Sequence, residues 1–79
     1  MRLDKYLKVS RVIKRRTVAN EACDAGRVLV NGKVAKAGLE VKPGDQVEIR
    51  FGNNTTRFEV LSIHEQMKKE EAHTMYKSL

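Results

Sequence analysis

The basic side chains concentrated in the first sixteen residues are the feature of this sequence best suited to binding a ligand. That stretch holds seven basic residues and a single acidic one, Asp4, for a net charge of +6. The remaining 63 residues hold nine basic and nine acidic side chains, so the whole surplus lies in the N-terminal stretch. Cations concentrated in one segment suit the binding of a polyanion. These residues are Arg2, Lys5, Lys8, Arg11, Lys14, Arg15 and Arg16.

The other reactive side chains do not suggest catalysis. His64 and His73 lie in the C-terminal segment without any recognised zinc-ligand spacing, so we interpret them as exposed. Cys23 falls on the apolar face of an expected helix and is better explained as a small core residue than as a nucleophile. The five glycines stand singly at expected turns and form no phosphate-binding loop. We therefore predict a binding module with no catalytic residues, no metal site and no cofactor.

Length and composition limit the remaining classes of protein. A chain of 79 residues accommodates one domain with a thin core. Its one cysteine cannot form an intramolecular disulfide, and no apolar run approaches the roughly 20 residues that span a bilayer. We see no secretory signal pattern after Met1. The expectation is a cytoplasmic monomer without a membrane partner.

Two helices are predicted in the N-terminal part. Leu3, Tyr6 and Leu7 recur at helical spacing and predict a helix over about residues 3–9. Residues 10–14 should connect it to a second helix over about residues 16–25, after which Gly26 is placed for a left-handed C-cap. At least one of the two apolar residues of the connection, Val12 and Ile13, should be buried. The expected inward face of the second helix comprises Val18, Ala19, Ala22 and Cys23.

Short strands are predicted in the remainder, which makes the fold class α+β. Asn31-Gly32 is a strong signal for a type I′ hairpin turn between strands at 27–30 and 33–35. An irregular connection over 37–42 and a turn at Pro43-Gly44-Asp45 precede strands at 46–51 and 55–63. Burial of both Leu61 and Ile63 would indicate a bulge or a change of pairing partner in the last strand. The segment 64–79 should be a short amphipathic helix or a frayed tail.

This arrangement would gather the basic residues on one surface. If the two helices are antiparallel neighbours, the cations of the first stand near Lys14, Arg15 and Arg16, and Arg11 joins the two groups. Cations at the start of a helix cost a few tenths of a kcal/mol up to about 1 kcal/mol, so an anionic partner explains them better than stability does. The block has no aromatic platform for single strands, because Tyr6 is expected in the core. Structured RNA, recognised through its phosphates, fits best.

The order and spacing of several short motifs closely resemble the S4-type RNA-binding domain. The resemblance covers about residues 1–63 and implies two N-terminal helices packed on a small, mostly antiparallel sheet, with 64–79 as a C-terminal tail or short helix. It also implies that the helices present the RNA-binding face. The residues that carry it are Arg2-Leu3-Asp4-Lys5-Tyr6-Leu7, Arg11, Lys14, Arg16, Gly26-Arg27-Val28, Val30-Asn31-Gly32 and Pro43-Gly44-Asp45.

Three segments resemble one group of stand-alone S4 proteins in particular: Arg2-Leu3-Asp4-Lys5-Tyr6-Leu7-Lys8-Val9-Ser10-Arg11, Ile13-Lys14-Arg15-Arg16-Thr17, and the tail from Lys68-Lys69-Glu70-Glu71-Ala72 to Met75-Tyr76. They look most like the RqcP family of bacterial ribosome-associated quality control. That resemblance implies binding to large-subunit ribosomal RNA and peptidyl-tRNA on an obstructed large subunit. It also implies support for RqcH, which adds an untemplated alanine tail to the stalled chain. The RNA-binding residues implied by position are Arg2, Lys5, Lys8, Arg11, Lys14, Arg15 and Arg16, with Lys36 as a further candidate beyond the hairpin.

Several alternatives remain at this stage. The chain could act as a heat-shock-type recycling factor for large subunits carrying nascent chains, or as a protein–protein adapter with a basic docking face. A stand-alone enzyme is disfavoured by the lack of a plausible catalytic set. Asp4 could orient a neighbouring arginine or form a simple surface pair with Lys8. Arg15 stands where many S4 domains have a Ser or Thr helix cap, a function that arginine cannot supply.

Overall fold

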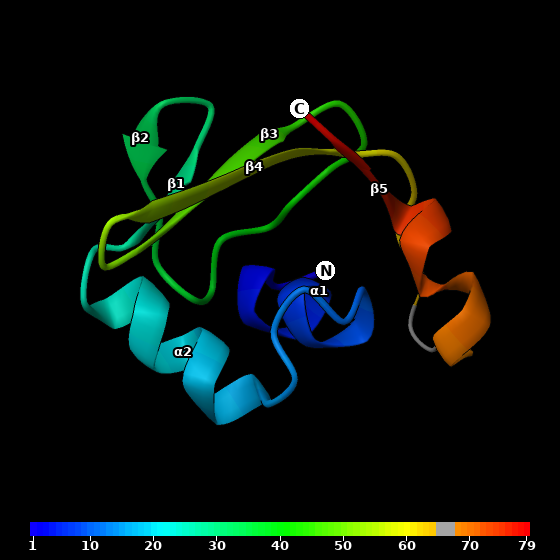
Figure 1. Cartoon of the computed structure of the whole chain (residues 1–79), viewed down its shortest axis with the longest axis horizontal. Coiled ribbons are helices and arrows are strands. Elements are labelled where there is room, and N and C mark those ends of the chain that lie inside the picture. The colour runs from blue at the N-terminus through cyan, green and yellow to red at the C-terminus, as the bar shows by residue number, and fades with distance from the viewer. Residues whose placement is uncertain (65–67) are drawn as a thin grey trace.

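The computed structural model describes residues 1–64 and 68–79. Within them the chain forms α1 (Leu3–Val9), α2 (Arg16–Asp24), β1 (Val28–Val30), β2 (Lys33–Val34), β3 (Gln46–Phe51), β4 (Asn54–Val60), the 3-10 helix η1 (Lys69–Met75) and β5 (Tyr76–Ser78). The strands form one antiparallel sheet in the order β2-β1-β3-β4-β5. Both α helices lie on the same side of this sheet (Figure 1). No helix in these two ranges is long and apolar enough to cross a membrane.

The core lies between the helices and one face of the sheet. Alternate residues of β1, β3 and β4 point inward, including Val28, Val47 and Phe58, and they meet Tyr6 from α1. The Tyr6 ring stacks near Phe58 with ring centroids 6.3 Å apart, and Tyr6 is fully buried. The expected inward position of Tyr6 is therefore confirmed, as is the two-layer α+β architecture.

Two glycine-dependent turns form as the sequence predicts. Gly26 has φ of +73° and ends α2 with hydrogen bonds from its own N–H to Cys23 and from the Arg27 N–H to Ala22. Asn31 and Gly32 have φ of 53° and 83°, as a type I′ hairpin turn requires. These turns fix where the chain leaves α2 and how the hairpin is oriented.

Several element boundaries and the burial of one side chain differ from expectation. α2 ends at Asp24, one residue early, and β2 ends at Val34. Val18, expected inside, is 41% exposed and lines an open surface hollow with Phe51 at the end of β3. β4 ends at Val60, and no bulge is needed because the exposed Leu61 follows the strand as the chain turns away to η1.

The C-terminal segment is more ordered than a tail. Residues 69–75 form η1, which agrees with the expected short helix, although it is a 3-10 helix. Tyr76–Ser78 instead form β5, an edge strand that pairs with β4 and was not predicted. Met75 is fully buried against the core. Residues 65–67 of the predicted segment lie outside the described residues.

Candidate nucleic-acid interface

Asp4 organises two of the predicted RNA-binding arginines around one buried carboxylate. The Asp4 side chain is only 2% exposed. It accepts hydrogen bonds from Arg16 Nε at 3.3 Å, Asn20 Nδ2 at 3.3 Å and the Lys5 backbone N–H at 2.8 Å, and Arg2 Nε lies 3.3 Å from its Oδ1. The orienting role for Asp4 is thus the alternative that the structure shows.

The electrostatics of Asp4 match this geometry. Burial alone would raise its pKa, but hydrogen bonds from Asn20, Arg16 and the Lys5 N–H, with the charge of Arg16, hold the pKa of Asp4 below its usual value. The carboxylate is therefore ionised at neutral pH. Arg2 and Arg16 remain 51% and 48% exposed, so their remaining N–H donors can reach a partner in solution.

The N-terminal residues are held in place by the connection that follows β2. The Leu3 and Asp4 N–H groups donate to the carbonyls of Leu39 and Ala37 at 2.8 and 3.2 Å. The N-terminal amine forms an ion pair with Glu40 at 2.7 Å. Packing of α1 against α2 then brings Arg16 to Asp4. Two segments distant in sequence thus fix the arginine pair before any ligand binds.

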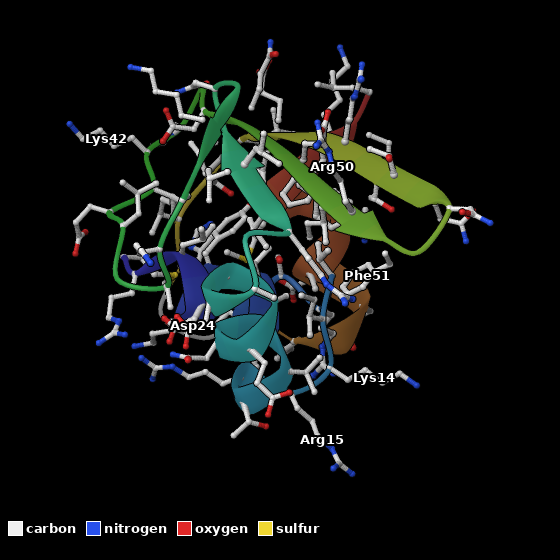
Figure 2. All side chains as sticks on the ribbon, turned by 90° about the vertical axis from the view of Figure 1, so that its left-hand side faces the viewer. Lys14, Arg15, Asp24, Lys42, Arg50 and Phe51 are labelled. Atoms are coloured by element: carbon white, nitrogen blue, oxygen red, sulfur yellow. The ribbon has the colours of Figure 1, made fainter. Side chains whose placement is uncertain are left out.

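The other predicted cations are not held by Asp4 in the way that Arg2 and Arg16 are. Lys8, Arg11, Lys14 and Arg15 are exposed, and none has an ion-pair partner within residues 1–64 and 68–79. Figure 2 shows Lys14 and Arg15 pointing away from the body of the protein. Lys5 is half-buried, and Lys36 is exposed on the connection that follows β2. The structure therefore brings Arg2 and Arg16 together on Asp4 and leaves the other predicted cations outside this pair.

Asn20 belongs to this site but was not predicted from the sequence. Its amide donates to Asp4 from one turn after Arg16, so both side chains leave the same face of α2. The i, i+4 spacing of Arg16 and Asn20 was the available signal. The spacing alone could not identify Asp4 as the shared acceptor, because the sequence does not show that Asp4 faces α2.

The start of α2 lacks the usual cap. Arg15 occupies the N-cap position with extended φ and ψ of −124° and 136°, and no side chain caps the helix there. The first turn contains no acidic residue. The prediction that Arg15 occupies the cap position of this helix is confirmed. The positive end of the helix dipole adds to the positive charge of the nearby basic residues.

Arg11 has a backbone conformation that its side chain does not favour. Its φ is +63°, and its N–H donates to the Lys8 carbonyl at 3.1 Å where α1 ends. Glycine adopts this conformation freely, whereas for other residues it raises the free energy of the folded state by about 1–2 kcal/mol. The side chain is exposed, and within the described residues no ion pair or hydrogen bond of this side chain offsets that free energy. An anionic ligand is the simplest reason for an arginine there.

Arg11→Gly is expected to stabilise the protein by about 0.5–1 kcal/mol while weakening RNA binding about three- to fivefold. Arg11→Ala removes the same charge but keeps the strain, so it should weaken binding equally without the gain in stability. Urea denaturation and filter binding of RNA measure the two effects. Equal stability of the two variants would show that the backbone at Arg11 is not strained. Unchanged RNA affinity in both would show that Arg11 does not contact RNA.

The residues considered for catalysis lie away from this site or are unreactive. Burial, with smaller contributions from the charges of Asp4 and Asp24, raises the pKa of the Cys23 thiol to about 11. Cys23 is therefore protonated at neutral pH and is a core residue, as expected. His64 and His73 are both exposed. Among the described residues, no three His, Cys, Asp or Glu side chains are grouped to hold a metal ion.

Comparisons with known proteins agree with this architecture. The S4 domain family model matches residues 1–47. The RQC P-site tRNA stabilizing factors of Halalkalibacterium halodurans and Streptococcus pneumoniae are 58% and 59% identical over 76 residues, covering 96% of this chain and 86% of each relative. The trimeric structure of Vibrio cholerae heat shock protein 15 superposes with a TM-score of 0.92 at 31% identity, covering all of this chain and 81% of that one. The chain belongs to the S4 domain family and, within it, to the family of the RQC P-site tRNA stabilizing factors.

Proposed function

We propose that this protein binds large-subunit ribosomal RNA and peptidyl-tRNA on obstructed large ribosomal subunits. There it stabilises the P-site tRNA while RqcH extends the stalled chain with alanine. It acts in the cytoplasm, as a monomer and without catalysing a reaction itself. The RNA-binding residues are Arg2, Lys5, Lys8, Arg11, Lys14, Arg15, Arg16 and Lys36.

The arginine pair held by Asp4 is the observation that carries this proposal. Both guanidinium groups are fixed by one buried carboxylate and still face solvent, which suits recognition of phosphates with little loss of side-chain entropy. The ribosomal context is supported by the relatives that share more than half of their aligned residues with this chain, which are RQC P-site tRNA stabilizing factors.

A heat-shock-type recycling factor is the second candidate. It is favoured by the TM-score of 0.92 with Vibrio cholerae heat shock protein 15. The sequence identity of 31% to that protein, against 58% to the Halalkalibacterium halodurans factor, favours the quality-control function. The third candidate is an adapter that binds only protein. Nuclease treatment distinguishes it, because an adapter would keep its protein partner when RNA is removed.

A tagged copy of the protein is expected to copurify with large-subunit RNA, peptidyl-tRNA and RqcH from cells in which translation is stalled. Sequencing the bound RNA and blotting for RqcH measures this, with an untagged strain as the background. Large-subunit RNA and peptidyl-tRNA without RqcH would indicate the recycling function. Retention of a protein partner after nuclease treatment, with no ribosomal RNA beforehand, would contradict RNA binding.

A further inference from the structure

A second basic surface lies beside the arginine pair, in a groove between the β1–β2 hairpin and the connection from β2 to β3. Val30, Val34 and Leu39 line its apolar part, and Val34 and Leu39 are 61% and 39% exposed. The rest is lined by three lysines together with Asn31, Ala35, Glu40 and Asp45. We call this the lysine groove; its basic residues are Lys33, Lys36 and Lys42.

The acidic side chains of the groove are already used in structural contacts. Glu40 pairs with the N-terminal amine at 2.7 Å. Asp45 accepts hydrogen bonds from Asn31 Nδ2 at 3.1 Å and from the Lys42 backbone N–H at 2.9 Å. The three lysine ammonium groups have no hydrogen-bond or ion-pair partner in the part of the chain that the structure describes. Asp45 keeps its charge, but none of the three ammonium groups is paired with a carboxylate there, so each can contact an anionic ligand.

The walls of the groove are rigid without any contribution from the lysine ammonium groups. The Asn31 side chain accepts the Gln46 N–H at 3.0 Å while donating to Asp45, which ties the hairpin turn to the start of β3. The Pro43-Gly44-Asp45 turn is closed by a hydrogen bond from the Asp45 N–H to the Lys42 carbonyl at 3.1 Å. Because folding does not require the three charges, a ligand explains them better.

The groove is also joined directly to the arginine pair. Leu39, which lines the groove, accepts the backbone hydrogen bond of Leu3, and Arg2 forms an isolated β-bridge with Glu40. The two basic surfaces are thus held in a fixed relation by backbone contacts. Figure 2 shows Lys42 extending outward at one edge of the molecule, away from the body of the fold.

We propose that the lysine groove binds the phosphate backbone of the same RNA that contacts Arg2 and Arg16, and so extends the RNA path across the connection between β2 and β3. This inference rests on the proposed function and adds Lys33 and Lys42 to its interface. Several lysines that are not neutralised, around an open groove, suit a polyanion of regular charge spacing. An acidic protein segment is the competing occupant, which the experiment below distinguishes.

The double variant K33Q/K42Q is expected to weaken binding to purified large ribosomal subunits about fivefold and to flatten the salt dependence. Loss of two phosphate contacts should reduce the log–log slope by roughly 1.4–1.8. The matched control K68Q/K77Q removes the same charge from exposed positions near η1 and on β5. It should retain the slope of the wild-type protein. Binding is measured by sedimentation between about 50 and 200 mM salt, the range over which such contacts are lost.

A third variant, R2Q/R16Q, separates failure of this inference from failure of the proposed function. If R2Q/R16Q weakens subunit binding while K33Q/K42Q behaves like its control, the groove proposal is overturned and the function stands. If none of the variants alters binding, the proposed function fails as well. If K33Q/K42Q keeps subunit binding but loses binding to a polyglutamate peptide, the groove serves an acidic protein and the RNA proposal is overturned.

Discussion

Asp4→Asn is expected to weaken RNA binding about tenfold, although it removes a negative charge from a basic surface. The amide cannot hold both Arg2 and Arg16, so each must lose side-chain freedom on binding RNA, at about 0.5–1.5 kcal/mol for each. Removing the negative charge of Asp4 opposes this by less than about 1 kcal/mol, because the guanidinium groups of Arg2 and Arg16 are half exposed to solvent. The loss of order should therefore outweigh the gain in attraction.

Filter binding of RNA at fixed salt, with folded protein confirmed by circular dichroism, measures the effect. The control is Glu59→Gln, which raises the net charge equally on β4, away from the arginine pair. Simple electrostatics predicts slightly tighter binding for both variants. Tighter binding by Asp4→Asn would therefore show that Asp4 only lowers the surface charge and does not position the arginines.

The same variant should reveal the contribution of Asp4 to stability. Hydrogen bonds to a charged group are worth about 1.5–3 kcal/mol, so Asp4→Asn should cost about 2 kcal/mol at neutral pH. Because the folded-state pKa of Asp4 is lowered, this stability is present above the unfolded pKa of about 3.9 and is lost as pH falls through the folded value. The difference in unfolding free energy between the two proteins should therefore be constant above about pH 5 and shrink below about pH 4.

The elements with strong local signals could be predicted from the sequence. The apolar spacing of Leu3, Tyr6 and Leu7 indicated α1, and Asn31-Gly32 indicated the hairpin because few other residue pairs adopt its turn. The concentration of basic residues before position 17 indicated the surface that we propose to bind RNA. All three signals depend on residues close together in sequence, which is why they needed no knowledge of tertiary contacts.

Features that depend on distant contacts could not be predicted. Asn20 joins the site only because α1 packs on α2 and turns Asp4 toward it. Val18 fits the apolar stripe of α2 but is 41% exposed beside an open surface hollow. Tyr76 fits a helical spacing with Ala72 and Leu79, yet it lies in β5 because β4 offers an open edge for pairing. Local pattern cannot indicate which edge or face a partner will cover.

Met75→Ala is expected to destabilise the protein by about 2–5 kcal/mol, the largest loss of stability predicted here. Met75 is fully buried at the junction of η1 and β5, so truncation leaves a cavity beside Tyr6. Urea unfolding, followed by circular dichroism and by the fluorescence of Tyr6 and Tyr76, measures it. Lys77→Ala, on the exposed side of β5, should cost no more than about 0.5 kcal/mol.

The outcome decides whether residues 68–79 unfold together with residues 1–64. A loss below about 0.5 kcal/mol, or two separate transitions, would show that the C-terminal segment is an appendage. Tyr6→Phe supplies an independent check, because the Tyr6 hydroxyl donates to the Met75 backbone carbonyl at 2.8 Å, a bond that Met75→Ala keeps. Losing that hydroxyl should cost about 1 kcal/mol. Since Tyr6 and Asp4 share α1, a single transition in both variants would mean that β5 and η1 help to hold the helix that carries the arginine-binding carboxylate.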